Sequence, residues 1–545
     1  MTRGLVPVTR ATCGPAPAAG DTCEIRESSW RGRGVAESAW GHTVPEAERN
    51  MADNVAEIQD HASALAFLFS RINYERVPMT PYGSRQFKLD RMRRLVQRVG
   101  NPERAFPAIH IAGTKGKGST AVMVAAALAA AGYRTGLYTS PHFERLEERL
   151  VVDGRPCAEE ELVALVAHLH PVVAELDREA DAAGDWQGPT FFEITTAAAL
   201  LHFQRRQVDC AVLEVGLGGR LDSTNVCHSA LSMVTSISFD HMQQLGTTLT
   251  SIAREKAGII KPAVPVVTGV TEEEPLAVIR QLALQNGSRL LELGRDFRFA
   301  HRPGRSGIAG PLAASNLGNG LDYEEEVDGG RLELRDVRIG LLGRHQAANA
   351  SVALASLQQL RRDGWRLNEG AIRRGLSEAY CPARIEIVSD WPVTVLDAAH
   401  NPASIGALLD TLNQLFDRRP RVLVFAASFD KDTRGMLDLL LPQFEHVILT
   451  RYLNSPRAAD PAELTAMSSS IKADRDLSRL RLHARPDPCS AWQLVEQLVS
   501  PAHLICVTGS FFLAAEMRPF STKAAGRSSA RHGPDQAAVP RCDGK

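Results

Sequence analysis

Short apolar runs alternate with longer amphipathic segments between about residue 51 and residue 520. This alternation is typical of strand–helix units, in which parallel strands are buried between helices. Eight apolar runs are predicted as strands, at residues 108–113, 209–216, 230–237, 265–270, 393–399, 421–427, 446–450 and 503–509. Several of them end in glycine or a polar residue, as strands next to an active site often do. The pattern therefore predicts an α/β protein.

Two stretches interrupt this alternation and divide the chain. Residues 295–338 are rich in Gly, Pro, Asn and acidic side chains, which predicts an insertion carrying a β-hairpin. A second break, near Cys381 and Pro382, predicts a linker between domains. Because 545 residues exceed the usual size of one domain, we expect a first domain over 51–380 and a second over 381–520.

The two ends of the chain lack helical or strand periodicity. Residues 1–50 are rich in Ala, Gly, Pro, Arg and Ser, and residues 521–545 carry scattered basic side chains with few aliphatic ones. Such segments cannot offset the entropy lost on ordering, so both are predicted to be disordered, with Met51 as an alternative start. A basic nucleic-acid-binding arm is the less favoured interpretation of the tail.

Composition excludes several classes of protein. The 62 basic and 63 acidic residues give a net charge of −1, which offers no general attraction for nucleic acid or anionic lipid. The longest apolar run, 122–131, is far shorter than the roughly 20 residues of a membrane span. The nine cysteines include no CxxC pair, and the first residues lack a secretory apolar stretch. We therefore expect a cytoplasmic protein without nucleic-acid or membrane partners.

The sharpest local signal is IHIAGTKGKGSTAVMVAAALAAAG at 109–132, an apolar strand, a glycine-rich turn and an alanine-rich helix predicted from about Ser119. Glycines let the backbone amides converge on one point, and a helix N-terminus adds partial positive charge. Lys117 can reach the outer phosphates of a nucleotide, and Ser119 or Thr120 can offer Mg²⁺ a hydroxyl. The alternative is a glycine-rich turn with an exposed lysine. The predicted ATP-binding residues here are Gly113, Thr114, Lys115, Gly116, Lys117, Gly118, Ser119 and Thr120.

A carboxylate follows a second apolar strand. Glu214 lies near the end of the run 209–216, where phosphate-loop proteins place a metal-binding acid opposite the lysine. A surface glutamate at a strand end is the alternative, but the GLGGR that follows demands close approach of the backbone. Ser119, Ser140 and Glu214 together offer hard oxygen ligands suited to Mg²⁺.

The loop GTKGKGS has glycine between its lysine and serine, and it resembles the ATP-binding loop of the Mur ligase superfamily. The remaining motifs resemble folylpolyglutamate synthase and dihydrofolate synthase, although Phe143 replaces the usual leucine. These motifs are YTSPHFERLEERLVVDG (138–154), LEVGLGGRLDSTNV (213–226), DHMQQLG (240–246), REKAGIIK (254–261), GRHQAANA (343–350), PARIEIV (382–388), LDAAHNP (396–402), FDKD (429–432) and TGSFFLAAEMR (508–518). The resemblance spans about 87–518.

The resemblance implies a fold and further site residues. The fold is a phosphate-loop ATPase domain with a mostly parallel sheet, followed by a smaller Rossmann-like α/β domain. His241 would bind a second Mg²⁺ shared with Glu214, and a carbamate on Lys256 would complete that site. From the residues alone, His241 is a capping or core histidine and Lys256 a surface helix lysine.

The resemblance also implies the contacts of the substrates. Asn349, Arg384, Asp397 and His400 match positions that contact ATP in the cleft between the domains, and salt-bridge or capping roles are the alternatives. His142 and Arg149 are candidates for holding substrate carboxylates. The predicted catalytic residues are Lys117, His241, Lys256 and Arg384.

The implied reaction uses ATP to activate a carboxylate as an acyl phosphate, which the amine of L-glutamate then attacks. The acceptors would be folates and also dihydropteroate, in a monomeric enzyme with no covalent nucleophile. The unusual segment TPYGSRQ at 80–86 leaves open an enzyme that acts on folates only. A peptidoglycan-precursor Mur ligase would need a longer domain before Gly113. The later motifs count against a simple ATPase or kinase, and the intact site residues count against an inactive binding protein.

Overall fold

The computed structural model describes residues 57–74, 89–182, 184, 188–304, 318–327, 330–416 and 419–529, with side chains of the last helix up to Thr522. All of them belong to one compact unit, Glu57–Lys545. The predictions made for 1–50, for the TPYGSRQ segment and for most of the tail lie outside these residues.

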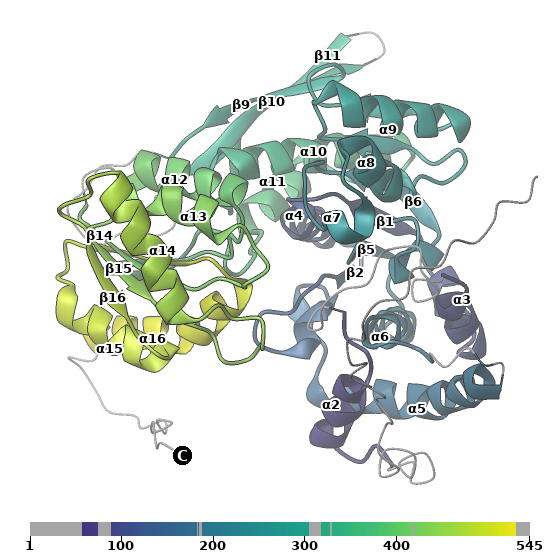
Figure 1. The fold of residues 1–545 in the computed structure, drawn as a ribbon. Coiled ribbons are helices and arrows are strands. Elements are labelled where there is room, and N and C mark those ends of the chain that lie inside the picture. Colours follow the sequence, from purple (N-terminus) through teal and green to yellow (C-terminus); the bar gives the residue numbers. More distant parts are fainter. Residues whose placement is uncertain are drawn as a thin grey trace, which may run out of the picture. The chain divides into compact units, whose positions relative to one another are not determined.

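The first half of this unit is built on an eight-stranded sheet with the order β4-β3-β2-β5-β1-β6-β7-β8 (Figure 1). Six strands are parallel, and β3 and β4 run antiparallel at one edge. The strands are β1 (Ala108–Ala112), β2 (Thr135–Tyr138), β3 (Leu150–Val152), β4 (Arg155–Pro156), β5 (Cys210–Glu214), β6 (Ser229–Val234), β7 (Val266–Thr268) and β8 (Leu290–Glu292).

Helices cover both faces of this sheet because its central strands are apolar on both sides. Ile109 and Ile111 of β1 pack into the core beneath α4, α10 and α11, whereas Ala108 packs into the core beneath α2, α3, α5 and α6. The helices of this half are α2 (His61–Ser70), α3 (Leu89–Arg98), α4 (Lys117–Ala130), α5 (Glu159–Ala182), α6 (Phe191–Arg205), α7 (Met242–Leu245), α8 (Leu249–Ala257), α9 (Glu273–Gln285), α10 (Arg344–Arg362) and α11 (Glu369–Glu378).

The stretch predicted as an insertion forms a three-stranded antiparallel sheet. Its strands are β9 (Phe297–Arg302), β10 (Asn319–Val327) and β11 (Gly330–Ile339). The β10–β11 pair is the predicted hairpin. Leu321, Tyr323 and Val337 pack into the same core as α4 and α10, so these strands form part of the first domain's core.

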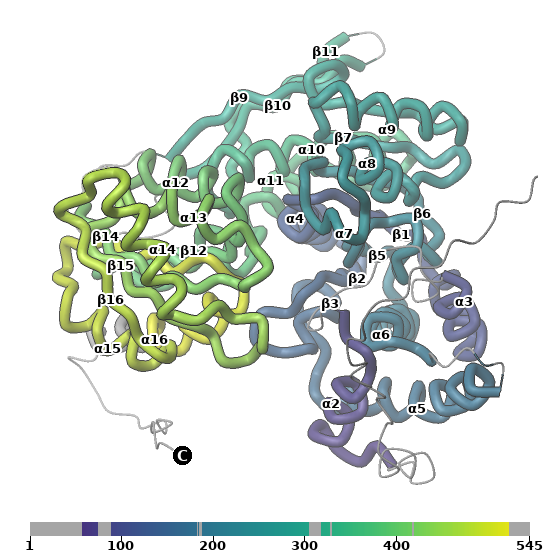
Figure 2. The backbone as a smooth tube through the Cα atoms, viewed as in Figure 1, coloured from purple at the N-terminus to yellow at the C-terminus, as the bar shows by residue number. Residues whose placement is uncertain are grey.

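The second half is a six-stranded sheet with the order β12-β13-β17-β14-β15-β16, parallel except for the edge strand β12. Figure 2 shows β14, β15 and β16 as neighbouring segments of the backbone. Its strands are β12 (Glu386–Asp390), β13 (Val393–Leu396), β14 (Arg421–Phe425), β15 (His446–Leu449), β16 (Arg481–Ala484) and β17 (Leu504–Thr508). Its helices are α12 (Pro402–Phe416), α13 (Thr433–Leu440), α14 (Pro461–Asp474), α15 (Pro488–Leu498) and α16 (Phe511–Ser529). Two α/β domains with mostly parallel sheets confirm the predicted fold class.

Two sequence predictions need correction. The helix after the glycine-rich loop begins at Lys117, two residues before the predicted start, because Gly116 adopts a left-handed conformation and caps the helix. The loose tail expected from Ser521 is instead helical as far as Ser529, where α16 ends. None of the helices in the described ranges is long and apolar enough to cross a membrane.

Candidate active site

The glycine-rich loop joins β1 to α4 and is held against the end of β6. Gly113 and Gly116 have φ values of +148° and +83°. A Cβ on Gly113 would lie 2.0 Å from Thr235 Oγ1, and one on Gly116 would lie 2.3 Å from Asn349 Oδ1. Glycine is therefore required at both positions for conformation and for space.

Helix α4 starts inside the predicted phosphate-binding motif. Lys117, Gly118 and Ser119 form its first turn, whose backbone N–H groups have no acceptor within the helix. The first hydrogen bond of the helix runs from Thr120 N to Gly116 O at 2.9 Å. The free N–H groups and the helix dipole make this turn an anion-binding position.

Glu214 lies beside this turn because β5 and β1 are parallel neighbours that end at the same edge of the sheet. Its Oε2 accepts a hydrogen bond from the backbone N–H of Ser140 at 3.1 Å. A Cβ on Gly118 would lie 3.3 Å from the same oxygen. Burial raises the pKa of Glu214, whereas the nearby Lys117 acts in the opposite direction. The structure thus brings Gly118, Ser140 and Glu214 together, with Ser119 buried in the same turn.

Asp240 and His241 follow β6 on the other side of the loop. His241 has a left-handed conformation (φ 51°), and its backbone N–H donates to Asp240 Oδ1 at 3.1 Å. The ring Nε2 lies 3.9 Å from the same oxygen. Among the described residues, His241 therefore pairs with Asp240, and it forms no hydrogen bond or ion pair with Glu214.

Lys256 is a buried lysine of α8, not the surface residue that its helix alone would predict. Its Nζ donates to the carbonyl oxygen of Gly113 at 3.0 Å, at the start of the phosphate loop. Burial and the nearby Lys117 lower the pKa of Lys256 to about 7. A substantial share of this amine is therefore neutral near physiological pH.

The second domain contributes a segment after the linker that is held by Asp397. Its carboxylate accepts hydrogen bonds from Ile385 N at 2.9 Å and from Ala399 N at 2.8 Å. Burial raises the pKa of Asp397 to about 6, although Arg384 opposes this shift. Asp397 therefore holds the backbone next to Arg384, at Ile385, and next to His400, at Ala399.

The remaining predicted residues have contacts of their own. Arg384 lies 6.0 Å from the ring centroid of Phe511, and Asn349 donates to Gln346 Oε1 at 2.9 Å while facing Gly116. Arg149 is fully buried and donates from Nε to His142 Nδ1 at 2.8 Å. The two candidate substrate residues are thus in contact, and only His142 is partly exposed.

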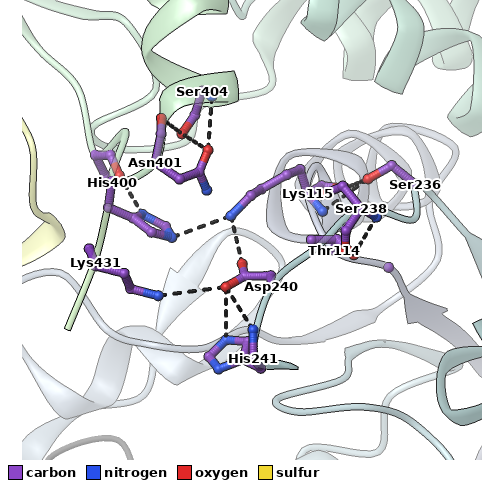
Figure 3. A network of polar contacts seen from close by, with 12 residues as sticks. Thr114, Lys115, Ser236, Ser238, Asp240, His241, His400, Asn401, Ser404 and Lys431 are labelled. Atoms are coloured by element: carbon purple, nitrogen blue, oxygen red, sulfur yellow. Dashed lines mark hydrogen bonds and ion pairs between the residues drawn. The ribbon is translucent and has the colours of Figure 1, made fainter. Parts of the chain in front are cut away.

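A polar network crosses from the phosphate loop to the second domain (Figure 3). Lys115 Nζ lies 2.8 Å from Asp240 Oδ2 and 3.4 Å from His400 Nε2, and Lys431 Nζ lies 3.6 Å from Asp240 Oδ1. Sequence reasoning assigned no role to Asp240 or Lys431. The signals were present, since both residues stand inside the quoted motifs DHMQQLG and FDKD.

A cavity of about 720 Å³ lies next to the start of β6, at the opposite end of that strand from Asp240 and His241. Its lining includes Arg93, Glu103, Arg104 and Lys261, and it includes none of the loop residues from Gly113 to Thr120. The candidate site is therefore defined by the side chains around α4 and not by this cavity.

Comparison with known proteins agrees with this geometry. Residues 187–357 match the Mur ligase middle domain, and residues 383–511 match the glutamate ligase domain of Mur ligases. The chain is 34% identical over 432 residues to the dihydrofolate synthase/folylpolyglutamate synthase of Bacillus subtilis. This match covers 79% of this chain and 94% of that protein. It is 36% identical over 430 residues to the folylpolyglutamate synthase of Lacticaseibacillus casei, covering 78% and 92%.

The fold matches as well. A structure of Mycobacterium tuberculosis folylpolyglutamate synthase complexed with ADP superposes with a TM-score of 0.73 at 32% identity, covering 86% of this chain and 99% of that one. Sequence, fold and domain composition agree over nearly the whole length of these proteins. The chain belongs to the folylpolyglutamate synthase/dihydrofolate synthase family of ATP-dependent Mur ligases.

Proposed function

We propose that the protein joins L-glutamate to the carboxylate of folates and of dihydropteroate at the expense of ATP. The observation that carries this proposal is the meeting of both domains at the phosphate loop, where His400 contacts Lys115 and Lys431 contacts Asp240. A ligase that must bring ATP, an acceptor and an amine together needs a site of this kind, built from two domains.

The reaction has two chemical steps. An oxygen of the acceptor carboxylate attacks the γ-phosphorus of ATP, and ADP leaves. The amine of L-glutamate then attacks the acyl carbon, loses a proton, and inorganic phosphate leaves as the amide forms. Lys117 and the first-turn amides of α4 neutralise the phosphoryl group during transfer, since two anions would otherwise repel each other. No enzyme nucleophile takes part.

The residues around Glu214 fit a divalent metal. Burial disfavours an isolated carboxylate, so a divalent cation would stabilise ionised Glu214 in addition to Lys117, and Ser119 and Ser140 add hard oxygen atoms nearby. We assign this position to one Mg²⁺ and His241 with Lys256 to a second. When bound, the metal would offset negative charge on the phosphates of ATP.

Lys256 is proposed to become a carbamate. The neutral amine attacks CO₂, its nitrogen loses a proton, and the product is an oxygen ligand in place of an ammonium group. The low pKa of Lys256 supports this chemistry because only the neutral amine reacts. Intact-protein mass spectrometry in bicarbonate should find a labile CO₂ adduct that Lys256→Arg removes and Lys472→Arg retains. An adduct unaffected by Lys256→Arg would refute the assignment.

The nucleotide is assigned to the loop Gly113–Thr120, with Lys117 as its phosphate-binding lysine, and to four further residues. Arg384 would stabilise charge on the phosphates, Asp397 would bond the ribose, and Asn349 and His400 would complete the ATP site. Residues 51–380 and 381–520 would then be the two catalytic domains. Contacts between these residues and the loop support the assignment, since Asn349 packs on Gly116 and His400 contacts Lys115.

The acceptor side is assigned to His142 with Arg149 behind it. Arg149 is fully buried, so its effect on a substrate carboxylate would act through the hydrogen bond to His142. We further propose a monomer in the cytoplasm with small-molecule substrates only. The name of the Bacillus subtilis relative includes both activities, whereas that of the Lacticaseibacillus casei relative includes polyglutamylation only.

The test uses purified protein with ATP, Mg²⁺ and L-glutamate, and with dihydropteroate or tetrahydrofolate as acceptor. ADP release and product mass are followed together. Addition of glutamate to both acceptors is the expected result. Addition to tetrahydrofolate alone would restrict the protein to polyglutamylation, and addition to neither acceptor would overturn the proposal.

A further inference from the structure

The phosphate loop contains two lysines, and the contacts of Lys115 suit a task other than phosphate binding. Its ammonium group lies 2.8 Å from Asp240 Oδ2 and 3.4 Å from His400 Nε2 (Figure 3). An ammonium group has three N–H donors, so these two contacts occupy most of its capacity. Asp240 follows β6 of the first domain, whereas His400 precedes α12 of the second.

The tautomer of His400 follows from its other contact. Nδ1 lies 2.9 Å from the carbonyl oxygen of Ala398, which can only accept a hydrogen bond. Nδ1 therefore carries the proton of the neutral ring, and the lone pair of Nε2 is left to accept from Lys115. Burial, followed by the charge of Lys115, lowers the pKa of His400 to about 3, which agrees with a neutral ring.

Asp240 also connects the network to a lysine of the second domain. Its Oδ1 lies 3.6 Å from Nζ of Lys431, which precedes α13. The side chain of Asp240 is 13% exposed, and those of Lys115 and Lys431 are 31% and 20% exposed. Charge pairs that are partly shielded from water are weakened less by salt than fully exposed ones.

We propose that Lys115 is a positioning residue that, with Asp240, His400 and Lys431, holds the second domain against the phosphate loop while the acyl phosphate exists. This latch rests on the proposed function and extends it. Lys115 belongs to the loop that binds ATP, so closure of the latch is coupled to the position of that loop. Lys117, in the first turn of α4, remains the phosphate-binding lysine.

The latch matters because the acyl phosphate reacts with water. If the domains separate before glutamate attacks, water adds to the acyl phosphate and releases the original carboxylate and inorganic phosphate. One ATP is then converted to ADP without an amide being made. A weakened latch should therefore raise the number of ADP molecules released per amide formed, which is close to one in a sealed site.

The experiment measures ADP and glutamylated product in the same reaction for Lys115→Met, Lys431→Met and the double variant. We expect each single variant to release about two to ten ADP per amide. The double variant should add little beyond the larger single effect, because both lysines act through Asp240. Lys115→Arg should retain coupling, and Lys472→Met on α14 is the matched control, expected to stay near one.

Phosphate binding by Lys115 predicts a different result. Lys115→Met would then raise KM for ATP with one ADP still released per amide, Lys431→Met would have no effect, and the latch would be refuted. If Lys115→Met does not fold, Lys431→Met decides between the two. The wild-type reaction is measured first, because absence of an amide product there would refute the proposed function.

Small-angle X-ray scattering tests the latch without turnover. Lys115→Met and Lys431→Met should both be more open than wild type, and an unchanged radius of gyration would refute the latch.

Discussion

The phosphate loop and the segment around Arg384 both bring charged groups to the candidate site, but they are shaped by different forces. In the loop, the unusual backbone conformations fall on Gly113 and Gly116, which adopt them without strain. Around Arg384, the left-handed conformations fall on Ala383 and Ile385, with φ of 52° each. Side chains there cost energy, which contacts from elsewhere must offset.

Three backbone hydrogen bonds supply such contacts, and the first runs from Ala383 N to the Glu386 carboxylate. Asp397 accepts the backbone N–H of Ile385, and Ala398 N donates to the carbonyl oxygen of Ala383. The loop therefore encodes its shape in its own residues, whereas the Arg384 segment takes two of these three contacts from residues beyond a strand. The following predictions test this contrast.

The largest effect should come from Lys117→Ala. In the proposed mechanism this change removes the positive charge nearest the transferring phosphoryl group, and it leaves the backbone of α4 able to form. We expect kcat/KM to fall by about 10³-fold or more, measured as glutamate incorporation. Lys472→Ala, on α14 of the other domain, should retain activity. A Lys117→Ala enzyme with near-normal turnover would show that the loop is not the phosphate site.

Gly116→Ala tests whether the loop depends on its own backbone. The new Cβ would need a left-handed conformation and would meet Asn349 Oδ1 at 2.3 Å. We expect activity to fall by about 10- to 100-fold because the loop must shift. Gly132→Ala is the matched control, since Gly132 has φ of 96° and no atom within 4 Å of an added Cβ. Equal losses in both variants would assign the effect to strain alone.

Asp397→Asn tests the long-range side of the comparison. An amide can accept one of the two backbone N–H groups but cannot replace the charge beside Arg384. We expect activity to fall by about tenfold through misplacement of Arg384. Asp410→Asn, on the exposed side of α12, should have no effect. A normal rate in Asp397→Asn would show that the segment does not need this carboxylate.

The stability of Asp397→Asn relative to wild type should increase as pH rises, although its activity is expected to be lower. Burial raises the pKa of Asp397 to about 6 in the folded protein from about 3.8 in the unfolded chain, so the folded state holds this proton more tightly. Its contribution to stability is complete below pH 4 and is lost as pH rises through 6. Urea unfolding from pH 4 to 7 should therefore shift in favour of Asp397→Asn by up to about 3 kcal/mol. A gap between the two proteins that is constant over this range would contradict the prediction.

The same contrast explains what the sequence could predict. All eight predicted strands overlap observed ones, because buried parallel strands are continuous apolar runs. Short or polar edge strands such as β4 and β16 escaped prediction because their side chains are largely exposed. In the site, the phosphate loop could be predicted from its glycines. The burial of Lys256 and the contact between Lys115 and His400 were not, since both depend on partners more than 100 residues away.

The smallest effect should come from removing residues 1–50. The motifs that resemble the family begin at about residue 87, so they lie outside this lead. A chain beginning at Met51 should keep kcat and KM within about twofold, because ends without periodicity tolerate removal.

A chain beginning at Leu89 gives the contrasting case. It loses α2 together with the His61–Glu147 contact at 2.6 Å and the Arg71–Asp177 pair, so it should unfold at lower temperature. Loss of activity already in the chain that begins at Met51 would mean that residues 1–50 contribute to the site.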